Sequence, residues 1–252
     1  MFADADLSDD KFLSGRLRLL QPLKGYRAAT DPVLLAAACD ARPGQLVLDL
    51  GCGVGAAALC LAARVPGVDL TGLEVQPGYA DLARRNAARN GIAFAVHEGD
   101  LTAMPPALRT TFDHVIANPP YYPPGGTPSP IEARARAMQQ MLPLTTWVQA
   151  GARRLKPGGW LTLICGADGL PDVLAGMQGK MGTVAVLPLT ARQGRAPARL
   201  LIQARKGGRG PFRLLAPLVL HLGVAHNGDR ESYTPVAGEV LRNGASLVAH
   251  FR

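Results

Sequence analysis

The sequence predicts an α/β protein built on a doubly wound, mostly parallel sheet. Short apolar runs alternate with helical stretches along the chain, and repeated strand and helix units of this kind are typical of parallel sheets. One of these units carries a glycine-rich turn between its strand and its helix. The 252 residues are enough to bury a good core and suit one domain with short additions.

The elements of the first half follow from local patterns. A brief alternation of polar and apolar residues predicts a leading strand over 16–20, and Thr30 or Asp31 with Pro32 is a good start for a helix. The elements that follow are a strand over 45–50, a glycine turn over 51–55, a helix over 56–64, a strand over 69–74, a helix over 77–90 and a strand over 93–97.

The second half supplies the remaining strands. They are expected at 112–117, 160–165, 184–187 and 200–204. Residues 132–155 have a mostly helical pattern that Pro143 interrupts, and the turn formers at 156–159 should precede the next strand. Residues 122–130 are rich in proline and glycine, so we expect a mobile loop there, either a substrate lid or a plain exposed linker.

The strand at 112–117 leads directly into Asn118, Pro119, Pro120 and Tyr121, which are suited to holding a planar amine. The side-chain oxygen of Asn118 and the carbonyl of Pro119 can each accept one N–H while the ring of Tyr121 stacks on the acceptor. Because proline fixes φ and donates no hydrogen bond, Pro119 and Pro120 should form a stiff corner. The alternative is that these residues form a simple turn with no functional role. A position just past a strand's carboxyl end favours a catalytic acceptor site.

The glycine turn is the candidate donor site. Gly51 and Gly53 permit backbone conformations that side chains forbid and let a ligand approach the main chain, while Gly55 opens the following helix. The glycine spacing alone fits a nicotinamide dinucleotide as well as S-adenosylmethionine. Asp49 places a carboxylate at the strand end, where it can hold a cationic amino group and would repel a pyrophosphate. This residue favours the sulfonium cofactor.

Two further acids end the next strands. Glu74 comes about twenty residues after the glycine turn, the usual distance for gripping ribose hydroxyls. Asp100 follows the strand at 93–97 and can accept a hydrogen bond from an adenine amino group. Either acid, taken singly, can also be a solvated loop residue or a helix cap. Together with Asp49, the acids at successive strand ends favour a cofactor pocket.

These motifs resemble the class I S-adenosylmethionine-dependent methyltransferases that modify amino groups. The N-terminal part narrows the resemblance, because residues 21–27 and 30–36 are similar to the leader of the bacterial tRNA adenine-N6 methyltransferases that act on the purine beside the anticodon of valine tRNA. Tyr233, Thr234 and Pro235 with the short helical tail are also similar to that family. The residues that carry the resemblance are the run from Asp49 to Gly55, Glu74, Gly99 with Asp100, and the run from Asn118 to Tyr121.

The resemblance implies a Rossmann-like, seven-stranded sheet whose last strand runs antiparallel. It also implies three segments: an extension over 1–44 that covers the cofactor, the methyltransferase domain over 45–206, and a basic extension over 207–252 packed on the same domain. Within the first segment it places Asp31 at the donor pocket. Where the leader of such enzymes is often more aromatic, this chain has Tyr26-Arg27-Ala28-Ala29.

The predicted reaction is methyl transfer from S-adenosylmethionine to the exocyclic N6 of a tRNA adenine that is turned out of a single-stranded loop. The main alternative is a protein glutamine N5-methyltransferase, since an amide nitrogen fits the same clamp. Against it, the segment before residue 45 is too short for the helical recognition domain that such enzymes usually carry. Methylation of rRNA or DNA amino groups, a non-catalytic RNA-binding scaffold and a nicotinamide oxidoreductase stay open.

Composition bounds the partners and the compartment. Residues 191–252 carry +7 of the net charge of +8, so this part can meet phosphates, although a solvated basic face is the alternative. The four cysteines show no C-x-x-C pair, which indicates reduced, mostly buried thiols and no metal site. With no long apolar run, we expect a cytoplasmic monomer or homodimer that binds tRNA and no membrane. The basic stretch consists of Arg192, Arg195, Arg199, Arg205, Lys206, Arg209 and Arg213.

Overall fold

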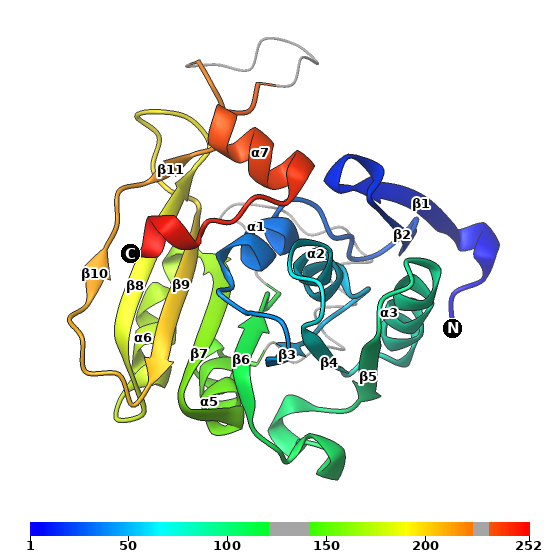
Figure 1. The fold of residues 1–252 in the computed structure, drawn as a ribbon, viewed down its shortest axis with the longest axis horizontal. Helices are drawn as coiled ribbons and strands as arrows, with labels where there is room; N and C mark the ends of the chain where they lie inside the picture. Colours follow the sequence, from blue (N-terminus) through cyan, green and yellow to red (C-terminus); the bar gives the residue numbers. More distant parts are fainter. Residues whose placement is uncertain (121–141, 224–231) are drawn as a thin grey trace.

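The computed structural model describes residues 1–120, 142–223 and 232–252, and these residues form a central sheet with helices on both faces (Figure 1). The strands and α-helices in chain order are β1 (Leu7–Phe12), β2 (Leu17–Pro22), α1 (Asp31–Ala38), β3 (Leu46–Leu50), α2 (Ala56–Arg64), β4 (Asp69–Glu74), α3 (Pro77–Arg89), β5 (Phe94–Glu98), β6 (Phe112–Ala117), α5 (Leu144–Arg154), β7 (Leu155–Gly166), α6 (Leu170–Met177), β8 (Met181–Thr190), β9 (Arg199–Lys206), β10 (Arg213–Leu214), β11 (Leu218–Val219) and α7 (Pro235–Asn243).

The main sheet has nine strands within the described ranges, in the order β10-β8-β9-β7-β6-β3-β4-β5, with β11 paired to β8. Strands β3 to β7 pair in parallel, and β9 runs antiparallel to both β7 and β8. The predicted doubly wound, mostly parallel sheet with an antiparallel last strand is therefore confirmed. Beyond the seven expected strands, the two-residue strands β10 and β11 extend its edge.

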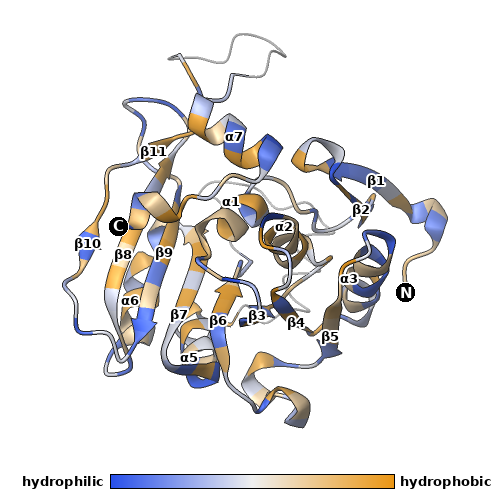
Figure 2. Cartoon of the chain, viewed as in Figure 1, coloured by the Kyte–Doolittle hydropathy of each residue, from blue (hydrophilic) through white to orange (hydrophobic). Residues whose placement is uncertain are grey.

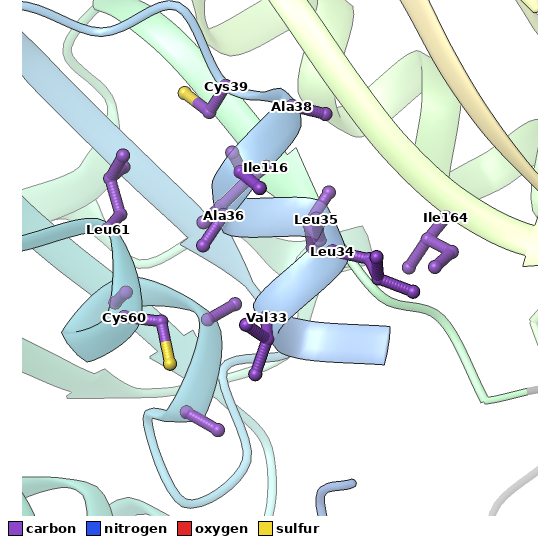
Figure 3. Close-up of a cluster of buried hydrophobic side chains, with 14 of the residues drawn as sticks. Val33, Leu34, Leu35, Ala36, Ala38, Cys39, Cys60, Leu61, Ile116 and Ile164 are labelled. Carbon is purple, nitrogen blue, oxygen red and sulfur yellow. The ribbon is translucent and has the colours of Figure 1, made fainter. Parts of the chain in front are cut away.

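Residues of one strand alternate between two separate cores. In β6, Ile116 joins the core under α1 and α2, whereas Val115 and Ala117 join the core under α5 and α6. Figure 3 shows the first core, where side chains of α1 and Cys60 and Leu61 of α2 gather with residues of β6 and β7. All four cysteines are free and buried, as expected. Because the central strands β3, β6 and β7 bury both faces, their sequences are largely continuous apolar runs.

Some elements differ from the sequence-based expectation. The pattern does not predict strand β1, because its sequence LSDDKF is mostly polar; in Figure 2 it is largely hydrophilic, in contrast to the hydrophobic β8 on the other side of the molecule. Helix α6 was not predicted either. Helix α5 begins after Pro143, and the earlier part of the expected helix at 132–141 lies outside the described residues, as does the 122–130 loop. The expected turn at 156–159 is an irregular stretch inside β7, between the pairs Phe112–Leu155 and His114–Trp160.

The N-terminal hairpin of β1 and β2 docks on α3 through two side-chain amides. Asn86 accepts a hydrogen bond from the Leu20 N–H at 2.7 Å and donates one to the Leu20 carbonyl at 3.1 Å. Asn90 does the same with Arg18, at 3.0 and 2.9 Å. One helix turn separates the two asparagines, so their amides lie on one face of the helix. There they make the hydrogen bonds to β2 that a neighbouring strand would make. The hairpin is thereby fixed beside the glycine turn, since Asn86 also donates to the Val54 carbonyl.

The C-terminal helix returns to the same side of the sheet as α1 (Figure 1). Helix α7 packs on α1, and the Leu247 N–H donates to the Ala37 carbonyl at 2.8 Å. The division of the chain into three segments, with boundaries at residues 44 and 206, stays a prediction. Among the described residues, no helix combines the length and the apolar character needed to cross a bilayer.

Candidate functional site

The order of the strands brings the two predicted motifs together. In the sheet β3 lies between β4 and β6, so the winding direction changes between β3 and β6. Leu50 of β3 pairs with Ala117 of β6. The turn that begins at Gly51 and the corner that begins at Asn118 therefore leave neighbouring strand ends. In open α/β sheets this switch point is where ligands bind.

The three glycines of the turn have positive φ angles, at 67° for Gly51, 55° for Gly53 and 85° for Gly55. Two of them are also pressed by neighbours. A Cβ at Gly51 would lie 2.6 Å from the Trp147 ring, and one at Gly55 would lie 3.1 Å from the Phe94 ring. Gly53 has no such close neighbour, and its main chain borders the cavity described below. The turn is thus packed from below and open on one side.

Asp49 lies beneath the turn with a partly unpaired carboxylate. The residue is 2% exposed, and its Oδ2 atom is buried without a hydrogen-bond partner among the described residues. Burial and, to a smaller extent, the nearby Glu74 carboxylate raise the pKa of Asp49, whereas the Ala58 N–H in the first turn of α2 lowers it, and the resulting pKa is about 7. A buried acceptor of this kind fits a cationic amino group, which would restore the charged form. This environment agrees with the expected binding of the methyl donor S-adenosylmethionine through its amino group.

An open cavity with about 330 Å³ of empty space lies above the turn. Its wall includes Asp49, Gly51 and Gly53 from the donor motif and Asn118 from the acceptor motif. Tyr26, from the segment before α1, lines the same cavity. Asn118 Nδ2 donates a hydrogen bond to the Tyr26 hydroxyl at 3.2 Å. The donor and acceptor motifs therefore open onto one space.

Glu74 and Asp100 are placed differently from Asp49, and neither lines this cavity. Glu74 is buried below the turn, where its Oε2 accepts from the Gly53 N–H and its Oε1 from the Gln76 N–H, both at 2.9 Å. Burial raises the Glu74 pKa, and these N–H groups act in the opposite direction. Asp100 is exposed and caps a short 3-10 helix by accepting from the Thr102 N–H at 2.7 Å. Glu74 thus holds the turn from beneath, and Asp100 makes the cap contact.

The other predicted site residues lie around the cavity. Asp31 begins α1 and forms an ion pair with Arg199 at the start of β9, while the next residue, Pro32, lines the cavity. Pro119 is buried and Pro120 is exposed. Tyr121 lies outside the described residues.

Tyr26 is the cavity residue that sequence reasoning missed as a functional candidate. Its side chain meets Asn118 from 92 positions away in the chain, so no local pattern marks the contact. The available signal was an aromatic residue directly after Gly25, ahead of the helix that begins at Asp31.

The basic stretch is divided between two edges of the sheet. Arg199 pairs with Gly166 at the carboxyl end of β7, whereas Arg205 pairs with Trp160. Arg195 precedes β9 and so lies toward the edge of the sheet where the parallel strands end, whereas Arg209 follows β9 at the opposite edge. Several members also bond backbone carbonyls: Arg192 to Leu222, Arg205 to Gly158, Lys206 to Leu155 and Arg213 to Phe251. The stretch does not form one continuous phosphate-binding face.

Comparison with known proteins gives the following matches. A family model described as methyltransferase small domain matches residues 29–191. A tRNA1(Val) (adenine(37)-N6)-methyltransferase of Porphyromonas gingivalis is 33% identical over 176 residues, which cover 65% of this chain and 68% of that protein. A release factor glutamine methyltransferase of Geobacter sulfurreducens is 31% identical over 169 residues, covering 62% of this chain and 57% of that protein.

Among solved structures, the crystal structure of a predicted O-methyltransferase from Agrobacterium tumefaciens superimposes with a TM-score of 0.68 and 27% identity. The match covers 86% of this chain and 97% of that one. This chain spans only part of the length of the two curated relatives. Within the described residues, no group of three or more His, Cys, Asp or Glu side chains is arranged to hold a metal ion.

Proposed function

Because the chain belongs to the methyltransferase small domain family, we propose that it transfers a methyl group from S-adenosylmethionine to the exocyclic N6 of a tRNA adenine. The favoured target is the purine beside the anticodon. The observation that carries the proposal is the shared cavity, in which Asn118 faces the same space as Asp49 and the glycine turn. The partial-length match to a tRNA adenine-N6 methyltransferase supports the choice of acceptor.

For the methyl donor, the chain supplies one buried hydrogen-bond acceptor and a stretch of main chain that a ligand can approach closely. We assign the unpaired Oδ2 of Asp49 to the amino group of the cofactor and the main chain at Gly51 and Gly53 to its amino-acid part. Glu74, which ends β4, is assigned to the ribose, and Asp100, which follows β5, is assigned to the adenine. When bound, S-adenosylmethionine supplies a methyl group carried on a positively charged sulfur.

On the acceptor side, Asn118 orients the amine. The lone pair of an exocyclic amine is delocalised into the ring, so the nitrogen becomes nucleophilic only when its hydrogens are held out of the ring plane. The amide oxygen of Asn118 and the carbonyl of Pro119 are the two acceptors that we assign to these hydrogens. Tyr121 is assigned to stacking on the base.

A nitrogen acceptor fits this site better than an oxygen acceptor. An alcohol or phenol would need a base to remove its proton before attack, and an amide such as Asn118 cannot act as one. Tyr26 does not serve either, because desolvation of its hydroxyl, together with the Asp31 and Asp49 carboxylates, raises its pKa to about 12, although the residue as a whole is 52% exposed. An amine that has been alkylated is strongly acidic and loses its proton to water without help.

The second candidate is a glutamine side chain in a release factor. An amide nitrogen also has a delocalised lone pair and fits the same two acceptors, and one partial-length relative carries that activity in its name. Unmodified tRNA and purified release factor, each incubated with the protein and methyl-labelled cofactor, separate the candidates. We expect label in tRNA and N6-methyladenosine in its nucleoside digest by mass spectrometry. Label in the release factor alone would reject the RNA assignment.

The role of Asn118 is tested by Asn118→Ala. The variant should lower the single-turnover rate of tRNA methylation by roughly a hundredfold, as loss of a catalytic hydrogen-bonding group does. Cofactor affinity, measured by calorimetry, should stay within about twofold, because Asp49 and the glycine turn are unchanged. A large loss of cofactor affinity with normal turnover at saturation would contradict the assignment.

A further inference from the structure

Tyr26 occupies a position between the donor and acceptor halves of the cavity. Its ring lies near the turn, since a Cβ at Gly53 would be 3.9 Å from Tyr26 Cε1. Its hydroxyl reaches the Asn118 amide. The residue is nevertheless 52% exposed, which is unusual for a large aromatic side chain held at a fixed place. The contact therefore depends on how firmly the segment that carries Tyr26 is anchored.

The anchor is Tyr79 of α3. Its hydroxyl accepts a hydrogen bond from the Tyr26 N–H at 3.0 Å and donates one to the Tyr26 carbonyl at 3.2 Å. Gly25 allows this approach, because it has φ of 118° and a Cβ there would lie 2.9 Å from the Tyr79 hydroxyl. Tyr79 is itself buried and packs edge-on against Phe2. Both backbone polar groups of Tyr26 are thus fixed by one side chain.

The contact with the Tyr26 hydroxyl is made by the donor end of the Asn118 amide. A side-chain amide has a donor end and an acceptor end, and the two differ only in which atom faces which neighbour. With Nδ2 donating to Tyr26, the oxygen Oδ1 is the end left for a substrate N–H. The reversed amide would present its own N–H groups to the amine and could not hold it.

We propose that Tyr26 is a positioning residue for the amine clamp, whose hydroxyl holds the Asn118 amide with its oxygen toward the acceptor nitrogen. The inference rests on the proposed function in so far as the acceptor is an amine. It predicts that Tyr26 acts through Asn118 and makes no separate contribution to the rate. The raised pKa of Tyr26 agrees with this role, because the hydroxyl stays neutral and its contact with Asn118 does not titrate near neutral pH.

The first test is a double-mutant cycle on single-turnover methylation of an unmodified valine tRNA transcript. Tyr26→Phe should lower the rate about tenfold, the loss expected for one neutral hydrogen bond, and should keep the shape of the pH profile. Cofactor affinity should stay within about twofold, since phenylalanine keeps the ring. In an Asn118→Ala background, Tyr26→Phe should have no further effect. Additive losses in the double variant would overturn the proposal.

A matched control removes a hydroxyl elsewhere. Tyr233 stacks on His221, with ring centroids 4.8 Å apart, near the start of α7. Tyr233→Phe should leave the rate unchanged, which shows that the effect at Tyr26 is not a general result of losing a tyrosine hydroxyl. An equal loss of rate in both variants would overturn the proposal.

A second readout does not depend on activity. The side-chain amide protons of Asn118, observed by ¹⁵N NMR in the full-length protein without substrate, should shift and exchange faster with water in Tyr26→Phe. Unchanged Asn118 resonances would overturn the positioning role whatever the substrate is. Shifted resonances in a protein that methylates no RNA would instead reject the proposed function and leave the contact established.

Discussion

Asp49 is a buried acid held near the point of ionisation. Its pKa lies at about 7 instead of the ordinary 3.8, mainly because burial disfavours the carboxylate. Between these two values the folded protein binds more protons at this group than the unfolded chain does. The free energy of unfolding that this group contributes is therefore greatest at low pH and falls as the pH rises through about 7. Binding a cation at Oδ2 acts in the opposite direction and favours the ionised form.

Asp49→Asn should raise the free energy of unfolding of the cofactor-free protein at about pH 8 by roughly 1–3 kcal/mol, because the neutral amide removes a buried charge. The gain should shrink at about pH 5, where Asp49 is protonated. Urea unfolding at both pH values measures it. The exposed Asp69 supplies the control, and Asp69→Asn should change little. A gain that is as large at low pH as at high pH would contradict this origin.

The same ionisation predicts how cofactor affinity depends on pH. In the wild-type protein, S-adenosylmethionine affinity should fall up to about tenfold per pH unit below about 7, because binding requires Asp49 to lose its proton. Calorimetry in buffers of different ionisation enthalpy measures both the affinity and the proton released. An affinity that does not change from about pH 5.5 to 8 would exclude Asp49 as the amino-group partner.

Gly51 combines a positive φ with a close neighbour, and Gly44 separates the two effects. Gly44 has φ of 80° and nothing within 4 Å of an added Cβ, whereas a Cβ at Gly51 would be 2.6 Å from the Trp147 ring. Gly44→Ala should destabilise by about 1–2 kcal/mol from backbone strain alone. Gly51→Ala should add roughly 1–3 kcal/mol for the displaced ring. Equal urea midpoints for the two variants would show that Trp147 moves aside freely.

At the scale of single residues, the sequence predicted cavity residues only where they belong to one short stretch of the chain. The glycine turn and Asp49 follow one strand within a few positions, so their spacing was enough to predict them. Glu74 is predicted from its spacing as a ribose ligand, and this role stays a prediction; the structure shows that it supports the turn through the Gly53 N–H. Tyr26 was missed because its role depends on a contact made across the fold.

At the scale of elements, α3 connects the hairpin to the glycine turn. Asn86 is fully buried and bonds three backbone groups, two on Leu20 and one on Val54. Asn90 is half-buried and makes the equivalent pair of bonds to Arg18. The position of β2 is thus set by side chains of a helix, which strand patterning cannot show. The sequence therefore predicted the strand but not the way in which it docks on α3.

Asn86→Ala should destabilise the protein by roughly 2–4 kcal/mol, because it leaves several buried backbone groups without a partner. Asn90→Ala should cost about 1 kcal/mol, since water can reach the exposed groups. Urea unfolding compares the pair. If the two substitutions cost the same, burial is not what makes the Asn86 contacts important.

At the scale of the whole molecule, the antiparallel course of β9 decides which basic residues lie at the same edge of the sheet as the cavity. Arg195→Gln should weaken binding of unmodified tRNA several-fold and reduce the slope of log affinity against log salt by about 1. Arg209→Gln removes the same charge at the opposite edge and should leave both unchanged. Filter binding at several salt concentrations measures the effects. A larger loss from Arg209→Gln would place the RNA on the other edge.

The overall architecture was the most predictable property of the chain. Alternating strand and helix patterns were enough for the doubly wound sheet, and the family match confirms the expected class of S-adenosylmethionine-dependent methyltransferases. The strands β10 and β11 were not predictable, because two residues show no periodicity. The sequence could not show that the two ends of the basic stretch lie at opposite edges, because this follows from the course of β9, which lies inside the stretch.

The ion pair between Asp31 and Arg199 joins residues that are 168 positions apart, and Gln203 bonds the carbonyl of Ala38 across 165 positions. A ribosome that adds about 5–20 residues per second needs roughly 10–30 s to travel from one partner to the other. Throughout that interval the first helix lacks the strand that secures it. A nascent chain released early would therefore carry a complete glycine turn beside a first helix that still lacks both of these contacts with β9.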